Sequence, residues 1–127
     1  MTLKSSAVFP EITGAVLVSK VSTDTTVYYN VTNGPGLLRA VLVNNLHGSA
    51  DAFVQLFDTT DTITKGTTEP DMQLPAPANS TRVYYFVPGI NHLNGLSFFT
   101  SLGGIGTADD ATSPTGNVLV SLIYTAT

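Results

Sequence analysis

The stretch "GLLRAVLVNN", residues 36–45, most constrains the fold because it is apolar on both sides of the strand that it predicts. Successive side chains of a strand point to opposite faces, so a strand with one wet face alternates apolar and polar residues. Here one face holds Leu37, Val41 and Val43 with Arg39, and the other holds Leu38, Ala40 and Leu42. The outer face of this strand therefore meets either the rest of the chain or another protein chain.

Three further runs show the same two-sided character. In "VLVSLIY" (118–124) Leu119 and Ile123 lie opposite the other apolar residues, "SFFTSL" places Phe98 opposite Phe99, and "VYYFV" places Tyr85 opposite Tyr84 and Phe86. A sandwich buries only the inner face of each sheet. The outer faces are covered either by long loops and the N-terminal segment or by neighbouring subunits. In the second case the candidate contact residues are Leu38, Leu42, Tyr85, Phe99, Leu119 and Ile123.

The rest of the chain consists of short β-branched and aromatic runs separated by Gly, Pro, Asn, Asp and Ser, which is typical of strands and turns. We predict a single antiparallel β-sandwich over residues 1–127, either jelly-roll-like or immunoglobulin-like, with about seven or eight strands and no significant helix. Residues 1–13 are a possible N-terminal arm. The predicted strands are Ala15–Ser19, Thr25–Thr32, Leu37–Asn44, Ala52–Asp58, Thr81–Val87, Leu96–Ser101 and Asn117–Thr125.

Two connecting segments stand out by composition. Residues 65–80 contain Pro70, Pro75 and Pro77, and proline lacks the N–H that a central strand needs. We therefore expect an extended edge segment that crosses from one sheet to the other. Residues 102–117 are glycine-rich and acidic, so we expect an exposed or mobile loop.

The composition excludes several classes of function. Charged residues make up 11% of the chain, against about 25% in ordinary soluble domains, so the surface is poorly suited to a lone monomer. The net charge is −4 and the five Lys and Arg residues are scattered, which argues against nucleic-acid binding. There is no cysteine, no apolar run long enough to cross a bilayer and no secretory signal, so we expect neither thiolate chemistry nor membrane insertion.

No constellation of residues predicts catalysis or a cofactor. His47 and His92 lie beside turn residues without a nucleophile-elbow motif, and we interpret both as hydrogen-bonding loop histidines. Glu11 and Glu69 lie in solvated segments that contain proline. We expect no enzyme activity, no catalytic residue and no bound cofactor.

The acidic stretches also fail as metal sites. "FDTTDT" and "TADDAT" lack the alternating oxygen ligands and the distal Glu of a calcium loop, so we expect no metal site there. Asp58, directly after an apolar run, is better interpreted as a turn starter whose carboxylate accepts a backbone N–H.

The block from residue 40 to residue 125 resembles small β-sandwich virion structural proteins of tailed bacteriophages. The resemblance rests on "NN" (44–45), "LFD" (56–58), "GTTEP" (66–70), "LPAP" (74–77), "GI" (89–90), "GL" (95–96) and Tyr124. It implies a structural role as a head decoration or cement protein, often trimeric, or as a small tail or neck component. No catalytic residue is carried over, and the matching Gly66, Gly95 and Pro70 are expected to shape turns and a corner.

These observations together predict a non-enzymatic virion component that stabilises a phage head through subunit contacts. Its expected partners are further copies of itself, as a homotrimer, and the major capsid protein or other virion proteins. We expect it to be made in the host cytoplasm and to leave the cell in the virion. The alternative is a β-sandwich module of a tail, neck or fibre that recognises a glycan or receptor through the 102–117 loop and exposed tyrosines.

Overall fold

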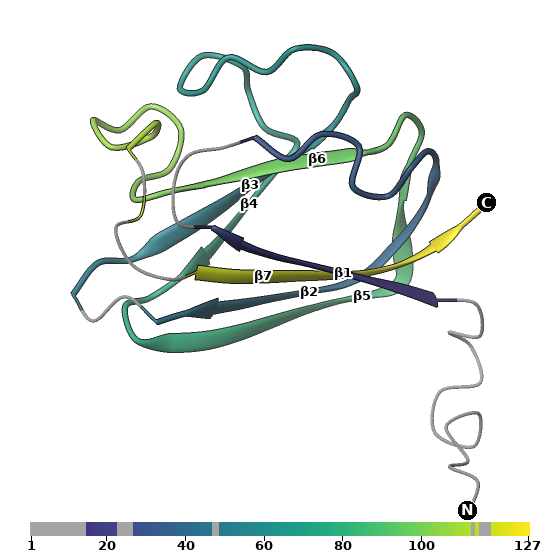
Figure 1. Ribbon diagram of the computed structural model, residues 1–127, viewed down its shortest axis with the longest axis horizontal. Coiled ribbons are helices and arrows are strands. Elements are labelled where there is room, and N and C mark those ends of the chain that lie inside the picture. Colours follow the sequence, from purple (N-terminus) through teal and green to yellow (C-terminus); the bar gives the residue numbers. More distant parts are fainter. Residues whose placement is uncertain (1–14, 23–26, 47–48, 113, 115–117) are drawn as a thin grey trace, which may run out of the picture.

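The computed structural model describes residues 15–22, 27–46, 49–112, 114 and 118–127 (Figure 1). The possible arm over residues 1–13, together with Glu11 and His47, lies outside the described residues. No helix long and apolar enough to cross a membrane occurs in the part of the chain that the structure describes.

The described residues form seven strands and no helix, as the sequence predicts. Runs of Val, Leu, Phe and Tyr fill most of them, since branched and aromatic side chains suit a pleated surface. Their bounds are β1 Ala15–Ser22, β2 Gly36–Asn45, β3 Ala52–Asp58, β4 Met72–Ala76, β5 Ser80–His92, β6 Leu96–Ser101 and β7 Val118–Ala126.

The strands form two antiparallel sheets, in the orders β1-β7-β2-β5 and β4-β3-β6. Residues 27–31 extend the second sheet beyond β6, because Tyr28 and Phe98 exchange backbone hydrogen bonds of 2.9 and 3.0 Å. With this segment counted, each layer has four members. Successive elements of the chain lie in alternate layers, except that β3 and β4 follow each other in the same layer. That path is a jelly roll, so of the two predicted topologies the immunoglobulin-like one is wrong.

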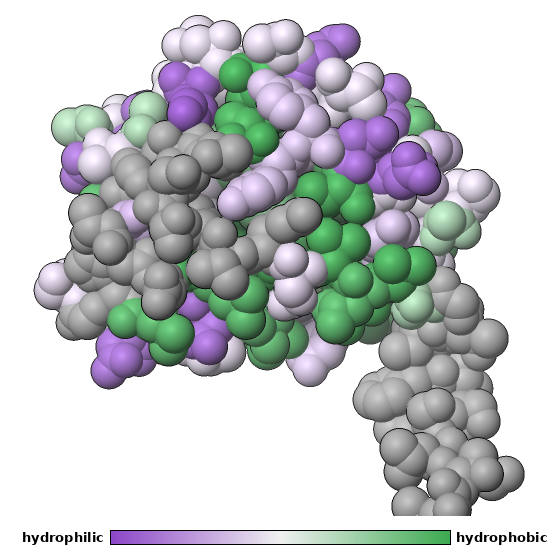
Figure 2. Space-filling model, viewed as in Figure 1, coloured by the Kyte–Doolittle hydropathy of each residue, from purple (hydrophilic) through white to green (hydrophobic). Residues whose placement is uncertain are grey.

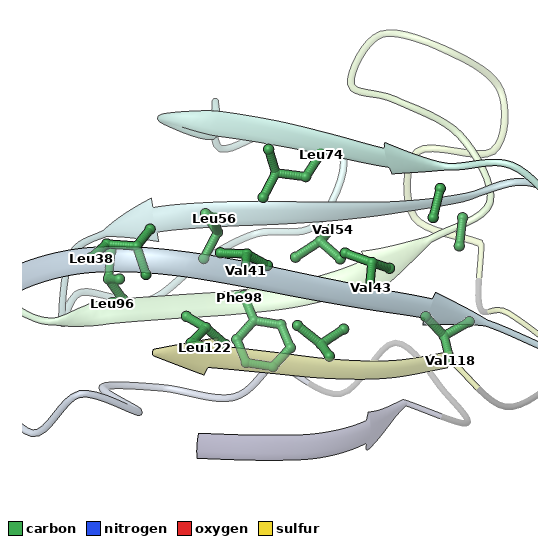
Figure 3. Packing of buried hydrophobic residues seen from close by; sticks show 13 residues of the cluster. Leu38, Val41, Val43, Val54, Leu56, Leu74, Leu96, Phe98, Val118 and Leu122 are labelled. Carbon is green, nitrogen blue, oxygen red and sulfur yellow. The ribbon is translucent and has the colours of Figure 1, made fainter. Parts of the chain in front are cut away.

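The two layers enclose one main core (Figure 3). β2 and β7 contribute valines and leucines from one sheet, while β3, β4 and β6 contribute Val54, Leu56, Leu74, Leu96 and Phe98 from the other. Tyr84 and Phe86 of β5 pack against this core from the sheet edge. Their neighbours Val83, Tyr85 and Val87 therefore point outward, as the alternation predicts.

A bulge in β2 overturns one predicted assignment. The pairing of β2 with β7 moves from Leu38–Tyr124 to Ala40–Ile123, so Arg39 is an extra residue relative to β7, whereas opposite β5 the larger insertion is residues 86–89 of β5. The extra residue reverses the alternation, and Leu38 shares the core face with Val41 and Val43. Leu38 is buried inside the protein and is not available as a contact residue.

The proline-rich segment behaves as predicted. β4 contains Pro75 and lies at the edge of its sheet, with β3 as its partner. From its end the chain turns through residues 77–79 into β5 of the other sheet. The Tyr84 hydroxyl donates to the Pro75 carbonyl and ties the two sheets together at this side of the sandwich.

Asp58 fastens the turn between β5 and β6 to the end of β3. Its carboxylate accepts the N–H groups of Leu93 and Asn94, each at 2.9 Å, and of Gly95 at 3.3 Å. Gly95 has φ of +132°, and a Cβ there would collide with the Asn30 side chain, so glycine is required. The predicted role of the Asp58 carboxylate as an acceptor of backbone N–H groups is confirmed, but the prediction that it starts its own turn is wrong, because the turn that it holds lies some 35 residues further along the chain.

The same hydrogen bonds control the ionisation of Asp58. Partial burial alone would raise the pKa of its carboxyl, but the three backbone donors and the nearby His92 outweigh burial and lower the pKa. The "LFD" and "GL" motifs, far apart in sequence, thus meet in one structural clamp.

We predict that Asp58→Ala lowers the free energy of unfolding by about 1–3 kcal/mol, because the N–H groups of Leu93, Asn94 and Gly95, the last of them partly buried, lose a charged acceptor. Asp58→Asn, which keeps one carbonyl oxygen, should lose less. Urea denaturation at neutral pH measures both changes. Asp61→Asn, in the same "FDTTDT" stretch but exposed, is the matched control and should change stability by no more than about 0.5 kcal/mol. An equal loss in the control would contradict the clamp.

Candidate interaction surface

The outer face of the β4-β3-β6 sheet is covered by the protein's own loops. Phe57 and Phe99 point outward from β3 and β6, and their rings stack with centroids 5.9 Å apart. Ile63, from the loop between β3 and β4, closes over them to form a second buried cluster. The Tyr29 hydroxyl accepts the Ile63 N–H at 3.0 Å and fixes this loop in place. Phe99 is therefore fully buried, and its prediction as a contact residue is wrong.

The glycine-rich segment between β6 and β7 covers the rest of the same face. The buried Gln55 amide donates to the Ser101 hydroxyl at 2.8 Å and to the Asp110 carbonyl at 3.2 Å. Gln73 accepts the Ile105 N–H at 2.8 Å. Residues 102–112 are thus fastened to β3 and β4, while residues 106–109, 111 and 112 are exposed, as expected for this segment.

The outer face of the β1-β7-β2-β5 sheet has no such cover among the described residues (Figure 1). Its most exposed apolar side chains are Leu17 at 63%, Tyr85 at 76% and Val87 at 92% of their full accessible area. Figure 2 shows hydrophobic residues gathered over this lower half of the molecule, whereas the loop side is mostly hydrophilic. Apolar residues on the outer face of the β4-β3-β6 sheet are thus covered by the protein's own loops, whereas those on the outer face of the β1-β7-β2-β5 sheet are left uncovered by the described residues.

We call this outer face the sheet surface. Four of the six predicted contact residues lie on it: Tyr85 is exposed, and Leu42, Leu119 and Ile123 are partly exposed. The register brings them side by side, since Leu42 and Ala40 of β2 pair with Val83 and Tyr85 of β5, and Leu17 of β1 pairs with Ile123 of β7. The prediction missed Leu17, Val83 and Val87, although the strand alternation already placed the last two beside Tyr85.

Arg39 is the single charged side chain that the described residues place on the sheet surface. Its Nε donates to the Thr125 hydroxyl at 3.2 Å, and its Nη1 donates to the Pro88 carbonyl. A guanidinium has five N–H donors, so these two bonds fasten the group to Thr125 and Pro88 and use only part of its donor capacity. The described residues give Arg39 no carboxylate partner.

A cavity of about 180 Å³ lies between the sheets at their β4 and β5 side. Leu38, Leu56 and Leu96 line it together with Asp58 and His92. His92 ends β5, is only 2% exposed and packs edge-on against the Tyr124 ring. Neither of its ring nitrogens has a hydrogen-bond partner among the described residues, so the prediction of a hydrogen-bonding loop histidine is wrong for His92.

Burial lowers the pKa of the His92 imidazole, while the Asp58 carboxylate and the Gly34 backbone offset only part of that effect. The histidine is therefore neutral at pH 7. No hydrogen-bonded Ser, Thr or Asp accompanies it, so the cavity holds no Ser–His–Asp arrangement among the described residues. The described residues also contain no group of three or more side chains placed to hold a metal ion.

The features proposed for glycan recognition lie far from one another. Tyr28 packs on Phe98 with ring centroids 5.3 Å apart, and the hydroxyls of Tyr29 and Tyr84 are used within the fold. Tyr85 is the tyrosine that remains most exposed, and it lies on the sheet surface, opposite the 102–112 loop. The loop and Tyr85 therefore do not form one binding site, while the other exposed tyrosine, Tyr29, is fastened through its hydroxyl to the loop of Ile63.

No protein-family model and no curated protein matches the chain. Among solved structures, a protein of Bacillus endospore appendages, which form disulfide-linked pili, aligns with a TM-score of 0.42 and 12% identity over 89% of this chain and 86% of its own. The coat protein of Tobacco streak virus aligns with a TM-score of 0.42 and 10% identity over 88% and 85%. At these scores neither likeness bears on what the chain does.

We predict that His92 makes the fold less stable in mild acid. Because the folded-state pKa is lowered, the unfolded chain binds a proton first, and stability falls as pH drops below about 6.5, by up to about 1.4 kcal/mol per pH unit. Asp58, whose pKa is also lowered, adds its own loss only below about pH 4. Urea denaturation between pH 7.5 and 5 should show a slope that His92→Gln abolishes and His47→Gln retains. A slope that follows His47 instead would contradict this assignment.

A second prediction separates the two outer faces. Phe99→Ala should lower the free energy of unfolding by about 3–5 kcal/mol, because it empties a fully buried site. Tyr85→Ser should change it by no more than about 0.5 kcal/mol, because the ring is largely in water. Thermal and urea denaturation of the two variants measure the difference. Equal losses would mean that the described loops do not cover Phe99 as they do in this structure.

Proposed function

We propose that the chain is a non-enzymatic structural component of a phage virion, most specifically a capsid decoration or cement protein. It acts as a homo-oligomer, expected to be a trimer, and binds the major capsid protein or other virion proteins. The observation that carries the proposal is the sheet surface, an apolar face that the described part of the chain leaves uncovered.

Three properties support this reading over a binding module or an enzyme. A chain with 11% charged residues gains solubility when neighbouring subunits cover its apolar surface. Large exposed apolar patches mark contact sites between proteins. The motifs shared with phage virion proteins form the clamp of Asp58 and the turns at Gly66 and Gly95, both with positive φ, so they serve the fold and not a reaction.

The sheet surface has the dimensions of a protein–protein contact. Four strands about 4.8 Å apart and about eight residues long span roughly 500 Å² in projection. The accessible area of side chains exceeds the flat area beneath them, and a standard interface buries about 800 Å² on each partner. One such face is therefore large enough to carry most of a stable contact.

We predict that the wild-type protein self-associates at micromolar concentration and that Tyr85→Asp together with Val87→Asp weakens the association at least about tenfold, because each change places a carboxylate in an apolar contact. Light scattering and sedimentation measure the association. Tyr85→Phe is the matched control and should retain it. A wild-type protein that remains monomeric at every concentration would contradict self-association through this face.

The virion role has its own test, by mass spectrometry and immuno-electron microscopy of purified particles of the phage that encodes the chain. The decoration proposal expects many copies on the head. Label on the tail would show a tail component and contradict the decoration role on the head. Absence from the particle would overturn the virion role.

A further inference from the structure

A buried imidazole lines the cavity between the sheets at their β4 and β5 side, which we call the His92 cavity. Strands of both sheets form its walls, and its volume is about 180 Å³. The buried Leu38, Leu56 and Leu96 form an apolar inner wall at one end of the main core (Figure 3). The rim includes Asp71, which is exposed, so the cavity opens to solvent on that side.

The His92 imidazole has no hydrogen-bond partner for either ring nitrogen among the described residues, although the side chain is only 2% exposed. A neutral imidazole has one N–H donor and one acceptor, and buried groups of this kind are normally paired. Two neighbours close part of the ring. A Cβ on Gly36 would lie 3.2 Å from Cε1 and Nε2, and the Tyr124 ring packs edge-on. The cavity is the side from which a partner can reach the imidazole.

Water alone fits the His92 cavity poorly. A buried water needs about two to four polar partners and takes up about 30 Å³ of liquid volume, so several waters would share the space. Those beside the leucine wall would find no partner there. An empty cavity would leave the imidazole unpaired. A molecule with an apolar body and one polar group satisfies both the leucine wall and the imidazole.

We propose that the His92 cavity binds a small neutral molecule whose apolar body lies against the leucine wall and whose hydroxyl group hydrogen-bonds to the His92 imidazole. A hydroxyl both donates and accepts, so it pairs with either tautomer of the ring. An engineered cavity of about 150 Å³ in another protein holds benzene, so the volume here suits a ligand with a single ring. The proposal is independent of the self-association proposed above.

Hydrogen bonds within the chain form the rim before a ligand arrives. The Asp58 N–H donates to Asp71 Oδ2 at 2.6 Å, and the Asp71 N–H donates to the Leu56 carbonyl at 2.8 Å. The Asp58 carboxylate in turn holds the N–H groups of Leu93 and Asn94, directly after His92. Both carboxylates are thus used in the fold, and their negative charge disfavours an anionic ligand.

Phenol and toluene test the proposal, because they share one ring and differ by a hydroxyl against a methyl group. Phenol should bind the wild-type protein about tenfold more tightly than toluene, since it supplies the hydrogen bond that the imidazole lacks. Benzoate, which carries a carboxylate on the same ring, should bind more weakly than either. NMR titration at neutral pH measures the three affinities, and the ¹⁵N signals of the His92 ring report the hydrogen bond directly.

Three kinds of variant locate the binding. His92→Phe keeps a ring and removes both nitrogens, so phenol should lose its advantage over toluene. Met72→Trp enlarges a partly exposed side chain of the cavity wall and should weaken the binding of both ligands about tenfold or more, and Ile90→Trp does the same from β5 if the first variant fails to fold. Tyr85→Ser, on the sheet surface, is the matched control and should leave both affinities unchanged. Circular dichroism and urea denaturation check that each variant folds.

Three results would overturn the proposal. Phenol and toluene that bind the wild type equally, or a preference for phenol that persists in His92→Phe, would remove His92 from the site. Binding that survives a folded tryptophan variant would place the ligand elsewhere on the molecule. Failure of both ligands to bind at millimolar concentration would leave the cavity to ordered water. None of these results bears on self-association, so the proposed function is tested separately.

Discussion

Two packed sheets bury their inner faces against each other and leave two outer faces, and every other feature of this structure follows from how those faces are covered. The β3–β4 and β6–β7 loops both lie over the outer face of the β4-β3-β6 sheet. The β3–β4 loop brings Ile63 onto the outer rings of Phe57 and Phe99, and the β6–β7 loop is fastened by Gln55 and Gln73. Among the described residues, the other side has only the strands themselves, with Leu17, Tyr85 and Val87 in contact with solvent.

The strand pattern was predictable because period-two alternation and Gly/Pro punctuation are local signals. Ala52–Asp58 and Leu96–Ser101 end where the sequence predicts, and the proline-rich segment is an edge strand. The errors come from effects that no local pattern carries. Leu38 faces the core because Arg39 forms a bulge, and Phe99 is covered because a loop far away in sequence folds over it. The jelly-roll order likewise depends on long-range pairing.

The functional surface was less predictable than the strands, because it depends on long-range contacts that a local pattern does not show. The histidine that looked like a surface hydrogen-bonding residue is buried against Tyr124, and no nucleophile accompanies it among the described residues. Asp58, in the "LFD" motif, is an anchor for a turn that the sequence places some 35 residues away. Leu42, Tyr85, Leu119 and Ile123 lie on the outer face that the alternation indicates, and their role as contact residues stays a prediction.

The uncovered sheet has a consequence for how the protein is made. A newly folded copy exposes the apolar sheet surface, and a chain with so few charged residues has little electrostatic repulsion to keep copies apart. Ordered association and amorphous aggregation then compete for the same apolar area, and the outcome depends on the concentration that the free copies reach. A cap on the concentration of unassociated copies is thus a physical requirement of this surface.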